Sequence, residues 1–324
     1  MEDTMKGTNT PAGADSTRDP SALAAAVVQA RFGTGITGKE AGDYLFRLAA
    51  AAAGQGAVLV LFPCYTGIFL AGHPFTVSSG EFDLLALVRH YGKDLEERYN
   101  TWGRETSRRL GIYLCPGTVI LPRGDGLLHR ARVFDPRGEA VGFQDQTHLT
   151  RHEAGTGYLP GEQLEPFPTP WGKMGLVIGT DNYFPEVARI LALGGARVLL
   201  APHALPAPYN YWQQMSGLWP QVQQNQVFGL EALAVGEVVG KSFLGRSSIY
   251  APCEITPGET GILYQAESER EELIGLARLE FRDLIHIQEE YPILGLMNTA
   301  LYTSRLLPAW KGLKGNNAKG VKGC

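Results

Sequence analysis

The sequence predicts an α/β fold built as one domain, and three observations support this prediction. The chain has 324 residues, of which 44% are hydrophobic and 19% are charged, so it can bury a large core. An uninterrupted apolar run at residues 23–30 (LAAAVVQA) is typical of a strand buried on both faces. A helical pattern and a second apolar run follow after short joints, and this order indicates a parallel strand pair with a right-handed crossover.

The sequence predicts a helix between these two strands from three signals: an N-terminal capping box, an apolar periodicity and a C-terminal glycine. Thr37 and Glu40 have the spacing of a capping box, in which each side chain bonds the backbone N–H of the other residue. Apolar residues then recur at helical intervals: Ala41, Tyr44, Leu45, Leu48 and Ala52. Gly54 supplies the end of the helix, and residues 57–62 (AVLVLF) form the second strand.

The elements that follow continue this alternation. Residues 82–110 form a long amphipathic stretch. Two segments, 127–134 and 139–143, flank a DPRG turn and predict a β-hairpin. A second unit of strand, helix and strand is indicated by three segments: residues 174–179, 185–193 and 196–202. This order fits helices that lie outside two packed sheets.

Composition separates both ends of the chain from the rest. Residues 1–20 are rich in Thr, Gly, Asp and Pro without a hydrophobic period, so we expect a disordered N-terminal tail. Residues 306–324 are expected to form a flexible basic C-terminal tail, because Gly, Asn and Lys dominate from residue 311. The single ordered domain is therefore expected to span residues 21–305.

Charge and composition exclude several classes of protein. A net charge of −4 and an isoelectric point near 6.0, without a basic stripe, argue against a nucleic-acid partner. We expect no membrane partner and a cytoplasmic location, because no apolar run reaches ~20 residues and no signal peptide is evident. The histidines are scattered, and four cysteines lack the spacing of a zinc site or a disulfide framework: Cys64, Cys115, Cys253 and Cys324. Reduced thiols, no metal and no cofactor are expected.

Several strings between about residue 23 and residue 302 occur in a fixed order: VVQA, GAVLVLFP, RVFDPRGEAVG, THL, LPGE, WGKMGLVIGTDNYFPE, GGARVLLAP and GRSSIYAP. One string alone would be weak support, whereas an ordered series of this length is strong. The series resembles the nitrilase superfamily of carbon–nitrogen hydrolases, whose members hydrolyse nitriles, amides and carbamoyl groups. The resemblance implies a four-layer αββα sandwich of nitrilase type, formed by a single domain.

The resemblance also implies a catalytic triad of glutamate, lysine and cysteine, yet all three positions hold other residues here. In the family, the cysteine thiolate attacks carbon, the glutamate transfers protons and the lysine stabilises the oxyanion. The glutamate position, after the second strand, contains Cys64. The lysine position of the K-x-H-L string contains Gln146, and the nucleophile position of C-x-D-x-x-F-P-E contains Gly179. A thiol, an amide and a hydrogen cannot perform these roles.

The residues around these positions support the alignment. Seven of them match the family pattern: Pro63, His148, Leu149, Asp181, Phe184, Pro185 and Glu186. A shifted alignment would require a cysteine near Gly179 or a lysine between Asp94 and Lys173, and the sequence contains neither. We therefore expect the family's mechanism to be absent.

Residues next to the replaced positions are the candidates for a ligand pocket. Glu153 is similar to a second family glutamate that positions the substrate, although a solvated loop carboxylate is an alternative interpretation. The other candidates lie close by in sequence: His148, Thr180, Asp181, Tyr65 and Tyr183. Without the lysine, such a pocket should prefer a small neutral or cationic molecule to a carboxylate.

Three functions remain open at this point. The favoured one is a non-hydrolytic pseudoenzyme that binds a small molecule or serves as an assembly subunit. A hydrolase with a rebuilt site is the second, in which Cys64 and His148 could form a thiolate–imidazole pair. The third is a purely structural partner, because the resemblance implies homo-dimers or larger oligomers. Residues 209–228, rich in aromatic side chains, could form the interface or pack in the core.

Overall fold

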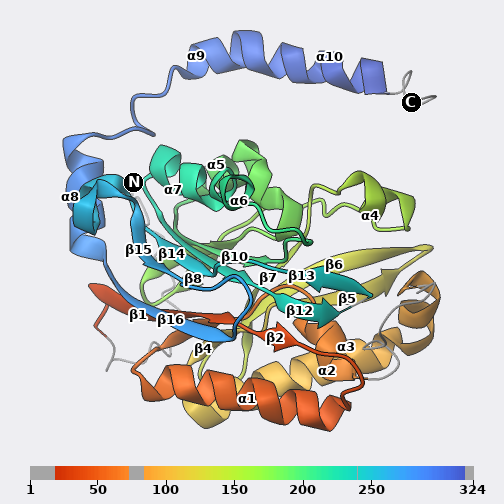
Figure 1. Ribbon diagram of the computed structural model, residues 1–324. Helices are drawn as coiled ribbons and strands as arrows, with labels where there is room; N and C mark the ends of the chain where they lie inside the picture. Colours follow the sequence, from red (N-terminus) through yellow and green to blue (C-terminus); the bar gives the residue numbers. More distant parts are fainter. Residues whose placement is uncertain (1–18, 73–83, 239, 318–324) are drawn as a thin grey trace, which may run out of the picture.

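The computed structural model describes residues 19–72, 84–238 and 240–317, which form a layered body and a helical arm (Figure 1). Two β-sheets pack face to face, and helices cover the outer face of each sheet. This architecture is the αββα sandwich that the resemblance implies. Most of the predicted N-terminal tail and the last seven residues of the predicted C-terminal tail lie outside the described residues.

The first sheet contains seven strands within the described residues, in the order β16, β1, β3, β4, β6 and β5, with β7 beside β6. The bounds of these strands are β1 (Ala22–Gln29), β3 (Leu59–Leu61), β4 (Tyr113–Cys115), β5 (Thr118–Arg123), β6 (Gly126–Phe134), β7 (Ala140–Asp145) and β16 (Leu273–Glu280). β1 and β3 pair in parallel, with Ala25 opposite Leu59, as the predicted crossover requires. β6 and β7 form the predicted hairpin.

The second sheet contains six strands in the described part of the chain, in the order β15, β14, β11, β10, β9 and β8. The bounds of these strands are β8 (Phe167–Thr169), β9 (Gly172–Leu176), β10 (Ala196–His203), β11 (Phe228–Leu233), β14 (Ser248–Tyr250) and β15 (Ile262–Gln265). β9, β10 and β11 run parallel. A smaller sheet consists of β2 (Arg31–Phe32), β12 (Val235–Val238) and β13 (Lys241–Phe243).

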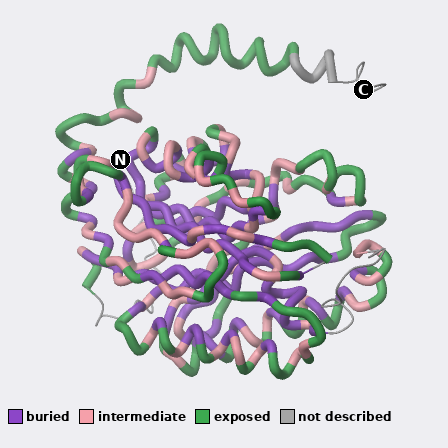
Figure 2. Tube along the Cα trace, viewed as in Figure 1, coloured by how far each residue is buried: buried purple, intermediate pink, exposed green. Residues whose placement is uncertain are grey.

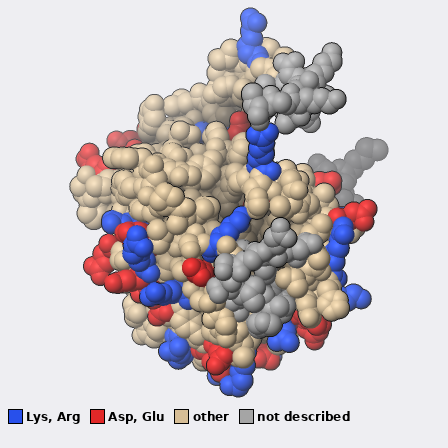
Figure 3. All heavy atoms as spheres, turned by 45° about the vertical axis from the view of Figure 1, so that its right-hand side comes forward, with Lys and Arg blue, Asp and Glu red and all other residues tan. Residues whose placement is uncertain are grey.

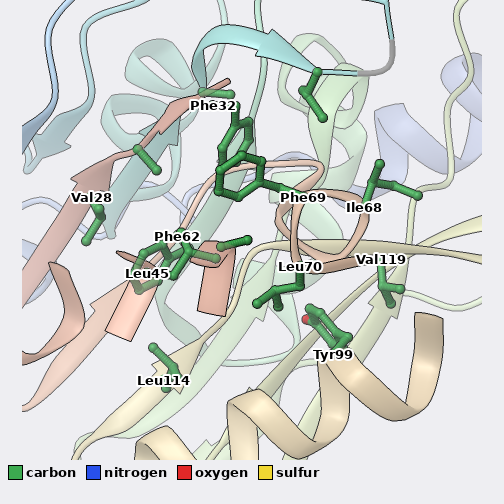
Figure 4. Close-up of a cluster of buried hydrophobic side chains, with 14 of the residues drawn as sticks. Val28, Phe32, Leu45, Phe62, Ile68, Phe69, Leu70, Tyr99, Leu114 and Val119 are labelled. Atoms are coloured by element: carbon green, nitrogen blue, oxygen red, sulfur yellow. The ribbon is translucent and has the colours of Figure 1, made fainter. Parts of the chain in front are cut away.

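Three helices cover the outer face of the first sheet: α1 (Gly38–Gly54), α2 (Thr66–Ala71) and α3 (Leu84–Leu110). α1 begins with the predicted capping box, because Thr37 accepts from the N–H of Glu40 and Glu40 accepts from the N–H of Thr37. It ends at the predicted Gly54. Side chains of α1, α3 and the strands meet in a buried cluster that includes Leu45, Phe62 and Tyr99 (Figure 4).

Helices α5 (Pro185–Leu193), α6 (Tyr211–Met215) and α7 (Leu218–Asn225) lie over the second sheet, where α5 and α7 pack on Leu199 and its neighbours. The other helical elements are α4 (Arg151–Gly155), α8 (Phe281–Glu290) and three 3₁₀ turns at Gly179–Tyr183, Cys253–Ile255 and Pro257–Glu259. Figure 2 shows that the buried residues concentrate in the strands between the helical layers. The interior of the body consists of three buried clusters: one between the first sheet and its helices, one between the two sheets, and one between the second sheet and its helices.

The arm consists of α9 (Thr299–Leu301), a π-helical turn (Tyr302–Leu306) and α10 (Leu307–Asn317). α10 falls in the segment for which the sequence predicts a flexible tail. No helix in the described ranges is both long and apolar enough to cross a membrane. On the face shown in Figure 3, acidic and basic side chains are interspersed.

Candidate functional site

Cys64, Gln146 and Gly179 meet at one place, although they follow different strands. Cys64 follows β3 of the first sheet, Gln146 follows β7 and Gly179 follows β9 of the second sheet. A Cβ atom placed on Gly179 would lie 3.3 Å from Oε1 of Gln146. The backbone N–H of Gly179 also acts on the Cys64 thiol, where it opposes the rise in the thiol's pKa. The fold therefore brings these three residues, which come from different parts of the sequence, to one place.

The Cys64 thiol is enclosed. Its residue is 1% exposed, and Sγ donates to the carbonyl oxygen of Pro202 at 3.1 Å. Burial raises the pKa of this thiol well above its ordinary range, because a thiolate would lose its hydration. Cys64 is thus a poor nucleophile and a poor base.

Gln146 is the centre of a hydrogen-bond network that links the two sides of the site. Its Oε1 accepts from Nδ1 of His129 at 2.8 Å, and its Nε2 donates to the carbonyl of His148 at 2.8 Å. The same Nε2 donates to Oε2 of Glu153 at 3.1 Å. Since an amide oxygen only accepts, His129 carries its proton on Nδ1, and Nε2 accepts from the hydroxyl of Thr118 at 2.5 Å. Gln146 therefore has its polar groups satisfied within the protein.

This network contains no cation. Burial lowers the pKa of His129, which favours the neutral ring that the hydrogen bonds require. Gln146 is 1% exposed and cannot carry charge. The family's lysine would supply a positive charge for a developing oxyanion at this point, and the amide supplies none.

Glu153 lies at the outer end of the network. It occupies the third position of α4, where it forms a second capping box with Thr150. Oε2 accepts from the backbone N–H of Thr150 at 2.7 Å and from its hydroxyl at 2.9 Å, in addition to Gln146. The side chain is half-buried, so this carboxylate is the charged group of the site that can meet a ligand.

Asp181 and His148 form the frame of the site. Asp181, 1% exposed, accepts from the backbone N–H and the hydroxyl of Thr147 and from the backbone N–H of His148. The His148 ring stacks on Phe184 at 3.8 Å, and its Nδ1 lies 3.1 Å from Asp181. These contacts tie the loop before α4 to the Gly179 turn. Thr180 lies in that turn and is half-buried.

Tyr65 adopts a strained backbone conformation directly after Cys64. Its φ of 68° lies in the left-handed region, which is unusual for a bulky side chain. Its N–H donates to Thr118 at 2.9 Å, and its ring stacks on His129 at 5.2 Å. On its other side the ring contacts Phe243 of β13 at 5.4 Å. Tyr65 therefore joins the network to the small sheet.

Sequence reasoning missed a second buried cluster, which contacts the Gly179 turn through Tyr183. Glu231 is fully buried and accepts from Nδ1 of His203 at 2.8 Å, from Gln214 at 2.9 Å and from Tyr250 at 3.1 Å. The Tyr183 ring meets His203 edge-on at 5.8 Å, and its hydroxyl is buried without a hydrogen bond to any described residue. In the sequence, this cluster is indicated by a single glutamate inside the otherwise apolar run FGLEALAV, because a charged residue in a buried strand needs polar partners.

His129 was also missed, although it lies inside the apolar strand run LLHRARVF. Both missed histidines are structural partners of other polar groups. In the described ranges, no three His, Cys, Asp or Glu side chains form a group that could hold a metal ion.

Comparison with known proteins identifies the family. The carbon–nitrogen hydrolase family model matches residues 25–261, more than half of the chain. The chain belongs to the carbon–nitrogen hydrolase family. It is 31% identical to a nitrilase of Pyrococcus abyssi over 227 residues, which cover 70% of this chain and 78% of the relative. It is 27% identical to an omega-amidase of Danio rerio over 267 residues, covering 78% and 87%.

Solved structures agree on the fold. A carbon–nitrogen hydrolase from Helicobacter pylori G27 has a TM-score of 0.71 and 19% identity, covering 88% of this chain and 98% of that chain. A double mutant of the amidase from Nesterenkonia sp. AN1 has a TM-score of 0.68 and 21% identity, covering 92% and 99%. At this level of identity, the structural similarity supports the αββα architecture alone. The chemistry of this chain has to be argued from the residues of its own site.

Proposed function

We propose that this chain is a non-hydrolytic member of the carbon–nitrogen hydrolase family. The observation that carries the proposal is the closed neutral network at the triad positions. Gln146 lies over Gly179 with its polar groups satisfied, and the Cys64 thiol is buried and bonded to a backbone carbonyl. The site thus holds neither an activated nucleophile nor a cation for an oxyanion, and its carboxylate, Glu153, is held by Thr150 and Gln146 at the outer end of the network.

The loss of all three roles should leave little catalysis. Removal of a nucleophile alone lowers kcat by several orders of magnitude, and the members of a triad act as a unit. Among the three residues, Gly179 argues most strongly against hydrolysis by the family's mechanism, because it has no side chain. A side chain there would be strained at its φ of 51° and would press on Gln146, so a cysteine could not be added without movement of the amide.

A hydrolase with a rebuilt site is the competing proposal. It requires Cys64 to be activated by a base such as His148. Within the described part of the chain no hydrogen bond joins these two residues: the Cys64 thiol donates to Pro202, and His148 Nδ1 faces Thr147 and Asp181. This geometry favours the non-hydrolytic proposal.

Ammonia release from simple amides, nitriles and N-carbamoyl compounds tests this choice. The wild-type protein should release no more ammonia than a Cys64→Ala variant or a buffer blank. Turnover by the wild-type protein that disappears in Cys64→Ala or Glu153→Gln would contradict the proposal and support the rebuilt site.

A binding role follows from the same site. Glu153 supplies a carboxylate at the edge of the site. The aromatic ring of Tyr65 lies on the inner side of the network, where it stacks on His129. An anion and an aromatic ring without an opposing cation suit a small neutral or cationic group. Thr180, Asp181 and Tyr183 line or support the turn beneath this position.

The arm favours an additional role in assembly. Every residue from 299 to 312 is exposed, including Leu301, Leu306 and Trp310 (Figure 2). An isolated helix of this length is marginal in water, and an apolar one is expected to be covered. The segment directly before the arm contacts the body, because a guanidinium nitrogen of Arg189 in α5 lies 3.8 Å from the sulfur of Met297.

We infer that a second copy of this chain covers the arm. The arm, residues 299–317, contains three Lys and Arg and no Asp or Glu, so with a total of −4 the rest of the chain carries −7. An apolar, basic arm therefore suits the acidic body of a partner copy. In the predicted interface segment, Leu218 is fully buried in the core, whereas Trp212 is 76% exposed and remains a candidate contact.

Sedimentation velocity of the full chain tests the assembly. The wild-type protein should sediment as a dimer or larger oligomer, and Leu306→Asp with Trp310→Asp should sediment as a monomer. Ser304→Asp, on a polar position of the same arm, is the matched control and should remain assembled. A monomeric wild-type protein would contradict this role.

A further inference from the structure

The hairpin of β12 and β13 brings a lysine to the site from a distant part of the sequence. Val238 lies opposite Lys241 in this hairpin, and Gly236 lies opposite Phe243. Side chains that are opposite each other, or two residues apart on one strand, lie on the same face. Val238, Lys241 and Phe243 therefore share one face of the hairpin.

That face is turned toward the triad positions. Val238 and Phe243 are buried in the core cluster that also contains Phe69, and the Phe243 ring contacts Tyr65 at 5.4 Å. Tyr65 in turn stacks on His129, which binds Gln146. The Lys241 side chain starts on this face and its residue is exposed, so its aliphatic part can follow the apolar surface while the ammonium group reaches water.

The electrostatics of Lys241 agree with this placement. Burial of part of the chain lowers the pKa of Lys241, and the carboxylate of Glu153 opposes this shift. No other charged group among the described residues contributes to the shift. Lys241 and Glu153, both described residues, thus act on each other without a direct ion pair of 4.0 Å or less.

We infer that Lys241 and Glu153 are the two charged ends of one binding site, and that its ligand is a small zwitterion. The ligand's anionic group would bind the Lys241 ammonium, and its ammonium group would bind the Glu153 carboxylate. Its uncharged middle would cross the exposed part of Tyr65. This inference rests on the proposed non-hydrolytic function and changes its expected ligand from a neutral or cationic molecule to one that carries both charges.

Lys241 does not restore the missing catalytic lysine. The position of the family's lysine is aligned with Gln146, which is buried and satisfied, whereas Lys241 is an exposed residue of the hairpin. A cation at the edge of a site selects ligands by charge, but an oxyanion must be contacted at the reacting carbon. Binding without turnover is the expected result.

Isothermal titration calorimetry with a series of ω-amino carboxylates of three to six carbons tests the inference. One length should bind the wild-type full chain, because the separation of the two charged groups is fixed by the fold. The corresponding ω-amino amide, which lacks the anion, and the carboxylic acid without the amine should each bind at least tenfold more weakly. Lys241→Met and Glu153→Gln should each weaken binding of the zwitterion at least tenfold.

Matched variants separate this result from general effects. Lys39→Met removes another exposed lysine, on α1, and should leave the affinity unchanged. In Lys241→Met, the amide analogue should bind as it does to the wild-type protein, because the anion contact is already absent. Failure of every ω-amino carboxylate to bind, or equal binding by wild-type and Lys241→Met proteins, would overturn the inference. Ammonia release from amides would instead contradict the proposed function.

Discussion

The cluster around Gln146 and the cluster around Glu231 both adjoin the Gly179 turn, and both join two strands through buried hydrogen bonds. The Glu231 cluster keeps a fully buried carboxylate, which receives donors from His203, Gln214 and Tyr250. The Gln146 cluster is neutral until its outer end at Glu153.

This difference shows that a buried polar cluster can be held together with a charge or without one. A buried ion whose partner is removed costs several kcal/mol, so a buried charge needs partners that a neutral side chain does not need. Here Cys64 and Gln146 are both neutral, and the amide finds new partners in His129 and Glu153. Where a carboxylate remains, at Glu231, three donors surround it.

The largest effect is expected when the charged cluster is broken. Glu231→Ala should lower the free energy of unfolding by about 3 kcal/mol or more, because His203, Gln214 and Tyr250 lose a shared acceptor. Urea denaturation measures this change. Glu289→Ala, at an exposed position on α8, should change it by about 0.5 kcal/mol or less. Similar values for both variants would show that the cluster is not a structural requirement.

A lysine returned to the neutral cluster should be costly by itself. Gln146→Lys removes the acceptor of the His129 Nδ1–H and buries an ammonium whose nearest counter-charge is the half-buried Glu153, so we expect a loss of about 2 kcal/mol in urea denaturation. Adding Cys64→Glu supplies a counter-charge, so the double variant should be more stable than the sum of the single effects by about 1 kcal/mol. Strict additivity would argue that the two losses are unrelated.

Effects of intermediate size on the free energy of unfolding are expected at the two capping boxes. Thr37→Ala on α1 and Thr150→Ala on α4 each remove an N-cap and should each cost about 1 kcal/mol. Only Thr150→Ala should also weaken ligand binding, since it removes the hydroxyl that donates to the Glu153 carboxylate and accepts from the Glu153 N–H. Equal affinity in both variants would remove Glu153 from the binding site.

The smallest effect is expected in the pH dependence of stability. Burial holds the pKa of His129 below its unfolded value, so below about pH 6.5 the unfolded chain takes up a proton that the folded chain excludes. His129 therefore lowers stability as pH falls from 7.5 to 5.5, and His129→Asn should flatten this dependence in urea denaturation. His286→Asn, on the exposed side of α8, should leave it unchanged.

Much of this structure could be predicted from local patterns in the sequence. The capping box at Thr37, the hairpin around residues 135–138 and the α5 helix all depend on residues close in the chain, and each was found where expected. The convergence of Cys64, Gln146 and Gly179 followed from the family resemblance, because the order of strings aligned these positions.

The rest depends on contacts between distant segments. His129 and His203 carry no local spacing that marks them, since their partners are Gln146 and Glu231 in other strands. Lys241 follows Gln146 by almost a hundred residues, and only the β12–β13 hairpin brings it to the site. Sequence reasoning could thus select Cys64, Gln146 and Gly179, which the fold brings together, but not the groups that surround them.

The most direct measurement is the reactivity of Cys64 toward chloroacetamide, followed by peptide mass spectrometry of the native full chain. The account predicts that Cys253, which is partly exposed, is modified before Cys64 and that Cys64 remains free until the protein is unfolded in urea. Modification of native Cys64 faster than Cys253 would show an open, activated thiol and would contradict the closed neutral site.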